Sequence, residues 1–351
     1  MTKDHSDAIL NAVPMALVRL DSDKRVVFSN EAARALLGGN IDGKLVTDVL
    51  RQPDFHAGLA LALAEGEKGR VRLMMAAKSG SAQIDAHITP LPSQDGVLRP
   101  GGGALLAFDD QTAQEQVSAI RRDFVANVSH ELRTPLTALV GFIETLRGAA
   151  RDDAAVRERF LAIMEREAGR MIRLVNDLLS LSRVEADEHR RPSATVEILG
   201  LLRSVIATQR DQAAAAGITI ALVAAESEIR LRGDGDQLTQ VFLNLAENGL
   251  KYGGAGGALR ISVSRVAHEP KLRGPAVVIE VADKGEGIDP IHLPRLTERF
   301  YRVDSHRSRE KGGTGLGLAI VKHIVNRHRG RFRIESEPQN GSKFIVILPE
   351  F

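Results

Sequence analysis

The sequence predicts a multidomain protein in which two α+β domains flank an antiparallel helical hairpin. Three observations support this. The 351 residues correspond to roughly two or three domains of ordinary size. Between about residues 112 and 189 glycine is scarce and apolar residues repeat at spacings of three and four, as in amphipathic helices. On either side, short apolar runs alternate with turn residues, as in sheets. We therefore expect domains at 1–110, 111–190 and 191–351.

The first domain is predicted to form one antiparallel sheet with helices between its strands. The helices are expected at NEAARALLG (30–38) and from 46 to about 64, and SQDGVLRPGGG (93–103) reads as a hairpin loop. The strands are expected at ALVRLDS (16–22), KRVVFSN (24–30), RVRLMMAA (70–77), QIDAHITPL (83–91) and GALLAFDD (103–110).

The second domain is predicted to be two long helices joined at GAARDDAA (148–155). A hairpin alone has too little neighbouring surface to bury its apolar seams, so we expect a homodimer that forms a four-helix bundle. The first seam comprises Val117, Ile120, Phe124, Val128, Leu132, Leu136, Leu139, Ile143 and Leu146, and the second Phe160, Met164, Met171, Val175, Leu178 and Leu179.

The third domain is again predicted to be α+β. Its helices are expected at DQLTQVFLNLAENGLKY (236–252) and GLGLAIVKHIVNRH (315–328). Its strands are expected at ALRISVSRV (258–266), AVVIEVADK (276–284) and KFIVILP (343–349).

Composition limits the classes of function. Hydrophobic residues make up 43% of the chain and charged residues 26%, which is ordinary for globular protein. The formal charge of +2 gives no reason to expect a nucleic-acid partner. The absence of cysteine excludes disulfides and thiolate chemistry. No run is apolar enough for a secretory signal or a membrane span, so we expect a cytoplasmic protein, although a chain trimmed of a membrane anchor would have the same sequence.

The stretch FVANVSHELRTPLTAL (124–139) contains a candidate nucleophile. His130 lies away from the apolar seam, and Pro135 is expected to bend the helix beside it. Glu131 can orient the imidazole and accept its proton while a ring nitrogen attacks phosphorus. Thr134 lies on the same face one turn later. The alternative is a solvated helix face with an incidental proline.

The third domain contains a candidate nucleotide site. Asn244 and Asn248 lie one helical turn apart, and their amide oxygens suit a Mg²⁺ ion that keeps most of its waters. Lys251 offers a charge to phosphate and Tyr252 a flat surface to adenine. Taken alone, the asparagines are better read as helix-surface residues.

Two glycine-rich segments complete the candidate site. Asp283 ends a predicted strand, and its carboxylate can accept a hydrogen bond from the amino group of a base. Gly285 and Gly287, which follow it, let the backbone pass close to that base. A second run, Gly313, Gly315 and Gly317, opens a predicted helix, where free N–H groups favour phosphate.

These motifs, in this order and with FYRVD (300–304) between the glycine runs, resemble the sensor histidine kinases of two-component systems. The segment 296–323 is most similar to the phosphate-regulon sensor kinase branch. The first domain looks like a PAS sensor, and FDDQT (108–112) is similar to the junction that follows such domains. The resemblance implies a dimerisation and histidine-phosphotransfer hairpin and an α/β-sandwich ATP-binding domain of the Bergerat, or GHKL, fold.

By this resemblance, the chain is an ATP-dependent and Mg²⁺-dependent protein-histidine kinase. His130 is the phosphoacceptor, Glu131 its general base, and Thr134 positions water for a phosphatase activity. Asn248 is the principal metal ligand, and a mobile ATP lid spans about 290–314. The residues implied in nucleotide binding are Asn244, Asn248, Lys251, Tyr252, Asp283, Gly285, Gly287, Phe300, Thr314, Gly315, Leu316 and Gly317.

The implied partner is the receiver domain of a response regulator, and recruitment to a membrane complex is compatible with the sequence. Two rival functions predict different residues. A GHKL-type ATPase clamp would carry a glutamate at the position of Asn244 to activate water. A non-catalytic scaffold that binds a receiver would be expected to lose His130 or its glycines. His56 and His87 are candidate haem ligands in the first domain, but lone histidines are usually structural.

Overall fold

The structure is a computed structural model and separates into two compact units, Met1–Ala126 and Asn127–Phe351. The boundary falls within one long helix. The three-domain division at residues 110 and 190 stays a prediction. The described residues are 3–77, 80–92, 103–148, 151–187, 190–253, 257–303 and 313–350.

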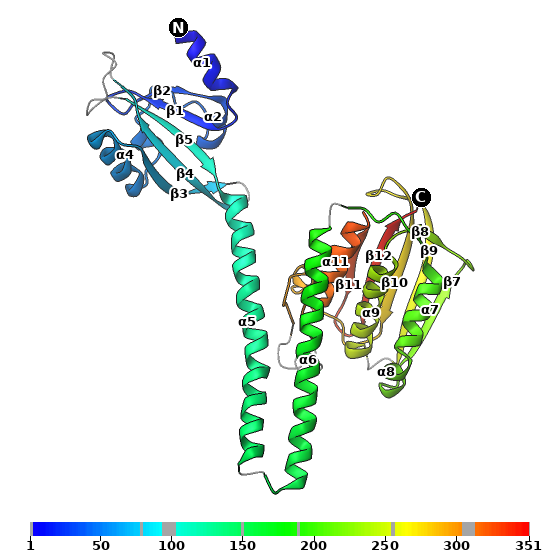
Figure 1. Ribbon diagram of the computed structural model, residues 1–351. Helices are drawn as coiled ribbons and strands as arrows, with labels where there is room; N and C mark the ends of the chain where they lie inside the picture. Colours follow the sequence, from blue (N-terminus) through cyan, green and yellow to red (C-terminus); the bar gives the residue numbers. More distant parts are fainter. Residues whose placement is uncertain are drawn as a thin grey trace. The chain divides into compact units, whose positions relative to one another are not determined.

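The first unit contains one five-stranded antiparallel sheet, with the strand order β2-β1-β5-β4-β3 (Figure 1). This confirms the five predicted strands, of which Ala104–Asp110 alternates most clearly between buried and more exposed side chains. The strands are β1 (Ala16–Leu20), β2 (Val26–Ser29), β3 (Gly69–Ala77), β4 (Gly80–Pro90) and β5 (Ala104–Asp110).

The helices of this unit are α1 (Lys3–Ala12), α2 (Glu31–Leu37), α3 (Val46–Val49) and α4 (Pro53–Glu65). The last three contribute to a single apolar core with the sheet. The prediction of one helix from 46 to about 64 was wrong, because Leu50 is extended and a new helix begins at Pro53. Helix α1 was not predicted. The predicted loop at 93–103 lies, apart from Gly103, outside the described residues.

The predicted hairpin is confirmed as α5 (Thr112–Arg147) and α6 (Ala154–Ala186). The phenyl rings of Phe142 and Phe160 lie 5.0 Å apart near the turn, and α5 continues through Pro135 without a break. Several large apolar side chains stay exposed in the single chain, as expected of a bundle that needs a second copy. They are Leu136, Val140 and Ile143 of α5 and Leu161, Ile172, Val175 and Leu179 of α6.

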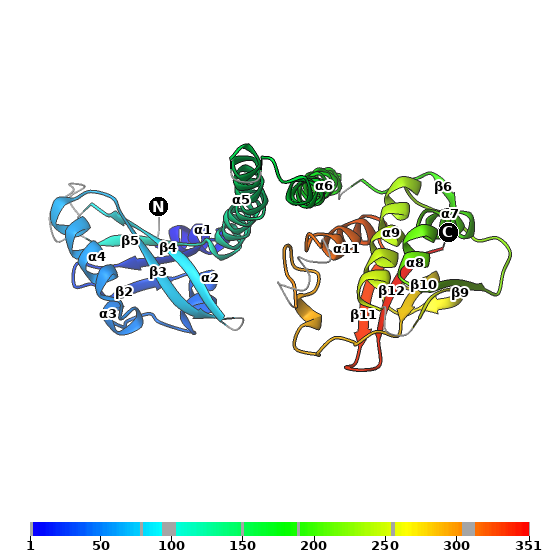
Figure 2. The ribbon, with the colours of Figure 1, turned by 90° about the horizontal axis from the view of Figure 1, so that it is seen from below.

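The rest of the second unit is a five-stranded sheet of order β11-β12-β10-β9-β7 with helices packed on one face (Figure 2). Among the described strands of this sheet, β7 and β9 pair in parallel and the other neighbours pair antiparallel. The predicted elements are confirmed as α9 (Gly235–Tyr252), β9 (Ala258–Glu269), β10 (Gly274–Asp283), α11 (Gly317–Arg327) and β12 (Ser342–Pro349). Not predicted were β6 (Thr195–Glu197), α7 (Ile198–Thr208), α8 (Arg210–Ala215), β7 (Thr219–Ala224), β8 (Arg230–Arg232), η2 (Leu293–Arg295) and β11 (Arg331–Ser336).

Helix α11 packs against both α9 and α6, so the hairpin contacts the helical layer directly (Figure 1). Within the described part of the chain, none of the helices has the length and apolarity needed to cross a membrane.

Candidate active site

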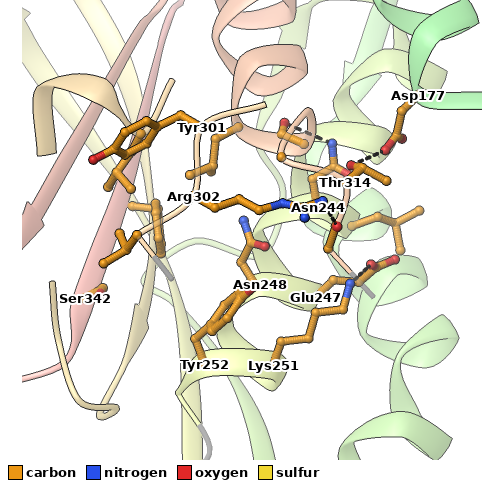
Figure 3. A pocket seen from close by; sticks show the side chains of 18 of the residues that line it. Asp177, Asn244, Glu247, Asn248, Lys251, Tyr252, Tyr301, Arg302, Thr314 and Ser342 are labelled. Atoms are coloured by element: carbon orange, nitrogen blue, oxygen red, sulfur yellow. Dashed lines mark hydrogen bonds and ion pairs between the residues drawn. The ribbon is translucent and has the colours of Figure 1, made fainter. Parts of the chain in front are cut away.

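A pocket of about 560 Å³ lies where α6, α9, the end of β10 and the start of α11 meet (Figure 3). Four elements from distant parts of the sequence supply its walls. All but three of the twelve predicted nucleotide-binding residues line it. The three that do not are Gly285, Phe300 and Leu316.

Helix α9 supplies one wall because it is amphipathic. Its apolar side, which includes Leu238, Phe242 and Leu245, is fully buried. The polar side therefore faces the pocket with Asn244 and Asn248, and the Asn244 amide donates to the carbonyl of Gly317 at 3.2 Å. That bond ties α9 to the start of α11.

The end of α9 brings charge and an aromatic ring to the same wall. Lys251 Nζ lies 2.9 Å from the Glu247 carboxylate, one turn earlier, and Tyr252 is next to it (Figure 3). Among the described residues, no three His, Cys, Asp or Glu side chains are grouped as a metal site. A Mg²⁺ ion here would take one or two ligands from α9, such as Asn248, and the rest from phosphate and water, which is its usual mode of binding.

Asp283, at the end of β10, also lines the pocket. Its Oδ1 accepts hydrogen bonds from the backbone N–H groups of Gly285 at 2.9 Å and Ser342 at 3.2 Å. Burial raises the pKa of Asp283, and these two bonds offset part of that effect. With Oδ1 held by the backbone, Oδ2 can accept from the amino group of a base. Gly287 adopts φ +70°, and a Cβ there would clash with the carbonyl of Glu337.

The start of α11 supplies backbone donors. Gly315 has φ +73°, and a Cβ on it would lie 2.9 Å from Cα of Phe300. Gly315 and Gly317 line the pocket, whereas Leu316 between them is fully buried. Leu316 is instead the residue before the helix, and its N–H donates to the Thr314 hydroxyl at 3.3 Å.

Phe300 contacts the segment before α11 through its backbone. Its N–H donates to the carbonyl of Gly315 at 2.9 Å, and its own φ is +64°. The predicted lid at 290–314 is described only as far as Val303 and from Gly313 onward. Tyr301, Arg302 and Val303 line the pocket at the base of that segment.

The three predicted catalytic residues lie on α5 and outside the pocket lining. His130 is exposed, and the Thr134 hydroxyl donates to its carbonyl at 3.2 Å. Glu131 lies between two arginines, with Arg170 Nη2 at 2.7 Å and Arg302 Nη2 at 3.6 Å. Arg302 also donates to the carbonyl of Gly313, so this side chain connects the pocket to the neighbour of His130.

Helix α6 contributes Arg173, Asn176 and Asp177 to the pocket, and none of the three was predicted. The one signal in the sequence is that Asn176 and Asp177 interrupt the apolar run between Val175 and Leu178. Asp177 Oδ2 accepts from the Thr314 hydroxyl at 2.7 Å, as the dashed line in Figure 3 shows.

Two family models match the chain. The model of histidine kinase-, DNA gyrase B- and HSP90-like ATPases matches residues 233–351, and that of the His Kinase A (phospho-acceptor) domain matches residues 120–187. The first match covers three walls of the pocket. The second covers most of the hairpin, including His130.

Similar proteins extend over nearly the whole chain. The phosphate regulon sensor protein PhoR of Pseudomonas aeruginosa is 38% identical over 336 residues, which cover 94% of this chain and 70% of PhoR. The sensor-like histidine kinase SenX3 of Mycobacterium tuberculosis is 34% identical over 347 residues, which cover 97% of this chain and 79% of SenX3. Among solved structures, histidine kinase ThkA in complex with response regulator TrrA has a TM-score of 0.52 at 20% identity, covering 98% of both chains, which supports the fold.

Proposed function

The chain belongs to the sensor histidine kinases of two-component systems, and from that premise we propose that its pocket binds ATP and that His130 receives the γ-phosphoryl group. One observation carries the proposal. Arg302 lines the pocket and lies 3.6 Å from the carboxylate of Glu131, the residue next to His130. The pocket and the phosphoacceptor helix are therefore joined by one side chain.

The residues divide into those that hold the nucleotide and those that act on the phosphoryl group. Asp283 accepts from the adenine amino group, Tyr252 packs beside the base, and Lys251 with the N–H groups at Gly315 and Gly317 hold the phosphates. Mg²⁺, held by Asn248 with support from Asn244, supplies charge neutralisation at the phosphates when it is bound.

In the transfer step a ring nitrogen of His130 forms a bond to the γ-phosphorus of ATP while the bond between that phosphorus and the bridging oxygen breaks. ADP leaves, and the imidazole proton passes to the Glu131 carboxylate. Arg170 fixes that carboxylate from the other side, at 2.7 Å. The catalytic contribution of the protein is mainly to place the groups in line.

The phosphoryl group then passes from His130 to an aspartate of a response regulator. Thr134, one turn from His130, positions a water molecule for the opposing phosphatase activity, which hydrolyses the acyl phosphate of the receiver. The exposed apolar stripe on α5 and α6 supports a homodimeric bundle, and the antiparallel sheet of the first unit supports a PAS-like sensor. Similarity to PhoR supports phosphate regulation as the setting.

The test is to incubate the chain with Mg²⁺ and γ-labelled ATP and to characterise the label. Wild type should carry an acid-labile, base-stable label that His130→Gln and Asn248→Ala both lose. His268→Gln is the matched control, since it makes the same change at an exposed histidine on β9 and should label normally. Labelling of His130→Gln equal to wild type would refute the phosphoacceptor assignment.

A further inference from the structure

The carboxylate of Asp177 lies at the end of the pocket where the start of α11 presents its backbone donors. Its Oδ2 accepts from the hydroxyl of Thr314 at 2.7 Å, and the same hydroxyl accepts from the N–H of Leu316 at 3.3 Å. Gly315 and Gly317, on either side of Leu316, line the pocket. An acidic side chain from α6 is thus connected, through one hydroxyl, to the amide that precedes α11.

Charged side chains of both signs surround the Asp177 carboxylate. Burial raises the pKa of Asp177, and the Thr314 hydrogen bond lowers it, while Glu247 adds a smaller repulsion. Lys251 and Arg173 are close enough to stabilise the ionised form. Lys251 is also the side chain that we assign to the phosphates of ATP, so one cation serves both anions.

We propose that Asp177 is an affinity-determining residue for ATP, because its carboxylate acts as an internal anion at the edge of the triphosphate site. The inference rests on the proposed function of the pocket. The Asp177 carboxylate and the phosphates repel one another and share Lys251 and the start of α11. Close packing of α6 on the ATP-binding domain and binding of ATP therefore oppose each other.

Further contacts hold α6, and with it Asp177, in place. Ser180 donates to the Gln240 side chain at 2.7 Å, and Arg299 Nη2 lies 2.5 Å from the Glu185 carboxylate. Coupling between two sites is reciprocal. A signal that shifts α6 through the hairpin changes ATP affinity, and ATP in turn loosens α6.

The experiment measures the Kd of Mg–ATP for the full chain by titration calorimetry, and that of adenosine by NMR titration. Asp177→Asn keeps an oxygen that can accept from Thr314 and removes only the charge. It should bind ATP about tenfold more tightly, within the usual range of coupling between sites, and adenosine as wild type does. Ser180→Ala removes an uncharged hydrogen bond of α6 to the same domain and should change the preference for ATP over adenosine much less.

Two results would overturn the inference: ATP binding by Asp177→Asn that is equal to or weaker than wild type, or an equal gain for adenosine and ATP. Asp177→Ser, which removes the same charge with a smaller side chain, is the second variant in case Asp177→Asn fails to fold, and it should show the same gain for ATP and none for adenosine. Failure of the proposed function is seen separately, because wild type would then bind no ATP in the same titration, or would bind ATP without labelling at His130.

Discussion

Replacing Asp283 by asparagine separates the charge of this carboxylate from its shape. Asparagine can present its oxygen where Oδ1 accepts from Gly285 at 2.9 Å and from Ser342 at 3.2 Å. The amide nitrogen then faces the adenine amino group, so a donor meets a donor. A hydrogen bond to a charged group contributes about 1.5–3 kcal/mol. We expect ATP affinity to fall by roughly tenfold to a hundredfold.

Stability without nucleotide should change in the opposite direction. Burial raises the pKa of Asp283 above its unfolded value, so the folded state disfavours the ionised form. The contribution of this group to stability is present at low pH and is lost as pH rises through the folded pKa. At neutral pH the neutral asparagine lacks that cost, and the variant should unfold at an equal or higher temperature than wild type.

The assay combines calorimetric titration with ATP and thermal unfolding without nucleotide, both at neutral pH. Asp211→Asn, the same chemical change at an exposed site on α8, is the control and should alter neither quantity. Unchanged ATP affinity in Asp283→Asn would refute the assignment of this residue to adenine. A joint loss of affinity and stability would show that the carboxylate is instead needed for folding.

Three further predictions concern other parts of the chain. Gly315→Ala places a Cβ 2.9 Å from a backbone atom at φ +73°, so calorimetry should show ATP binding weakened more than about tenfold while circular dichroism shows the fold retained. Thr134→Ala should label at His130 as wild type does but fail to dephosphorylate a phosphorylated receiver; normal phosphatase rates would contradict its role. Val140→Asp, on the exposed stripe of α5, should give monomers in light scattering, whereas Val223→Asp on β7 should not.

The elements with strong periodicity were predictable from the sequence. The two hairpin helices, α9 and α11 each carry apolar residues at spacings of three and four. The five strands of the first unit are short apolar runs bounded by turn residues. The break before Pro53 was missed although the sequence marks it, since Arg51 and Gln52 interrupt the apolar run and proline is a usual first residue of a helix. Short elements such as β6 and β8, with three residues each, are too brief to show a period.

The site was predictable where one short segment carries several functional groups, as α9 does with Asn244, Asn248 and Lys251. It was not predictable where the site is built from contacts between distant segments. The separation from Glu131 to Arg302 and from Asp177 to Thr314 exceeds one hundred residues in each case, and both contacts exist only after α6 has packed on α11. No local pattern encodes such pairings.

The measurement that tests the account most directly is the position of the phosphoryl group on the chain. Wild-type protein would be incubated with ATP and Mg²⁺, digested at neutral or basic pH, and its peptides sequenced by mass spectrometry. We expect the phosphoryl group on His130 and no phosphopeptide from Asn248→Ala treated in parallel. A phosphoryl group found on another residue, with His130 unmodified, would contradict it.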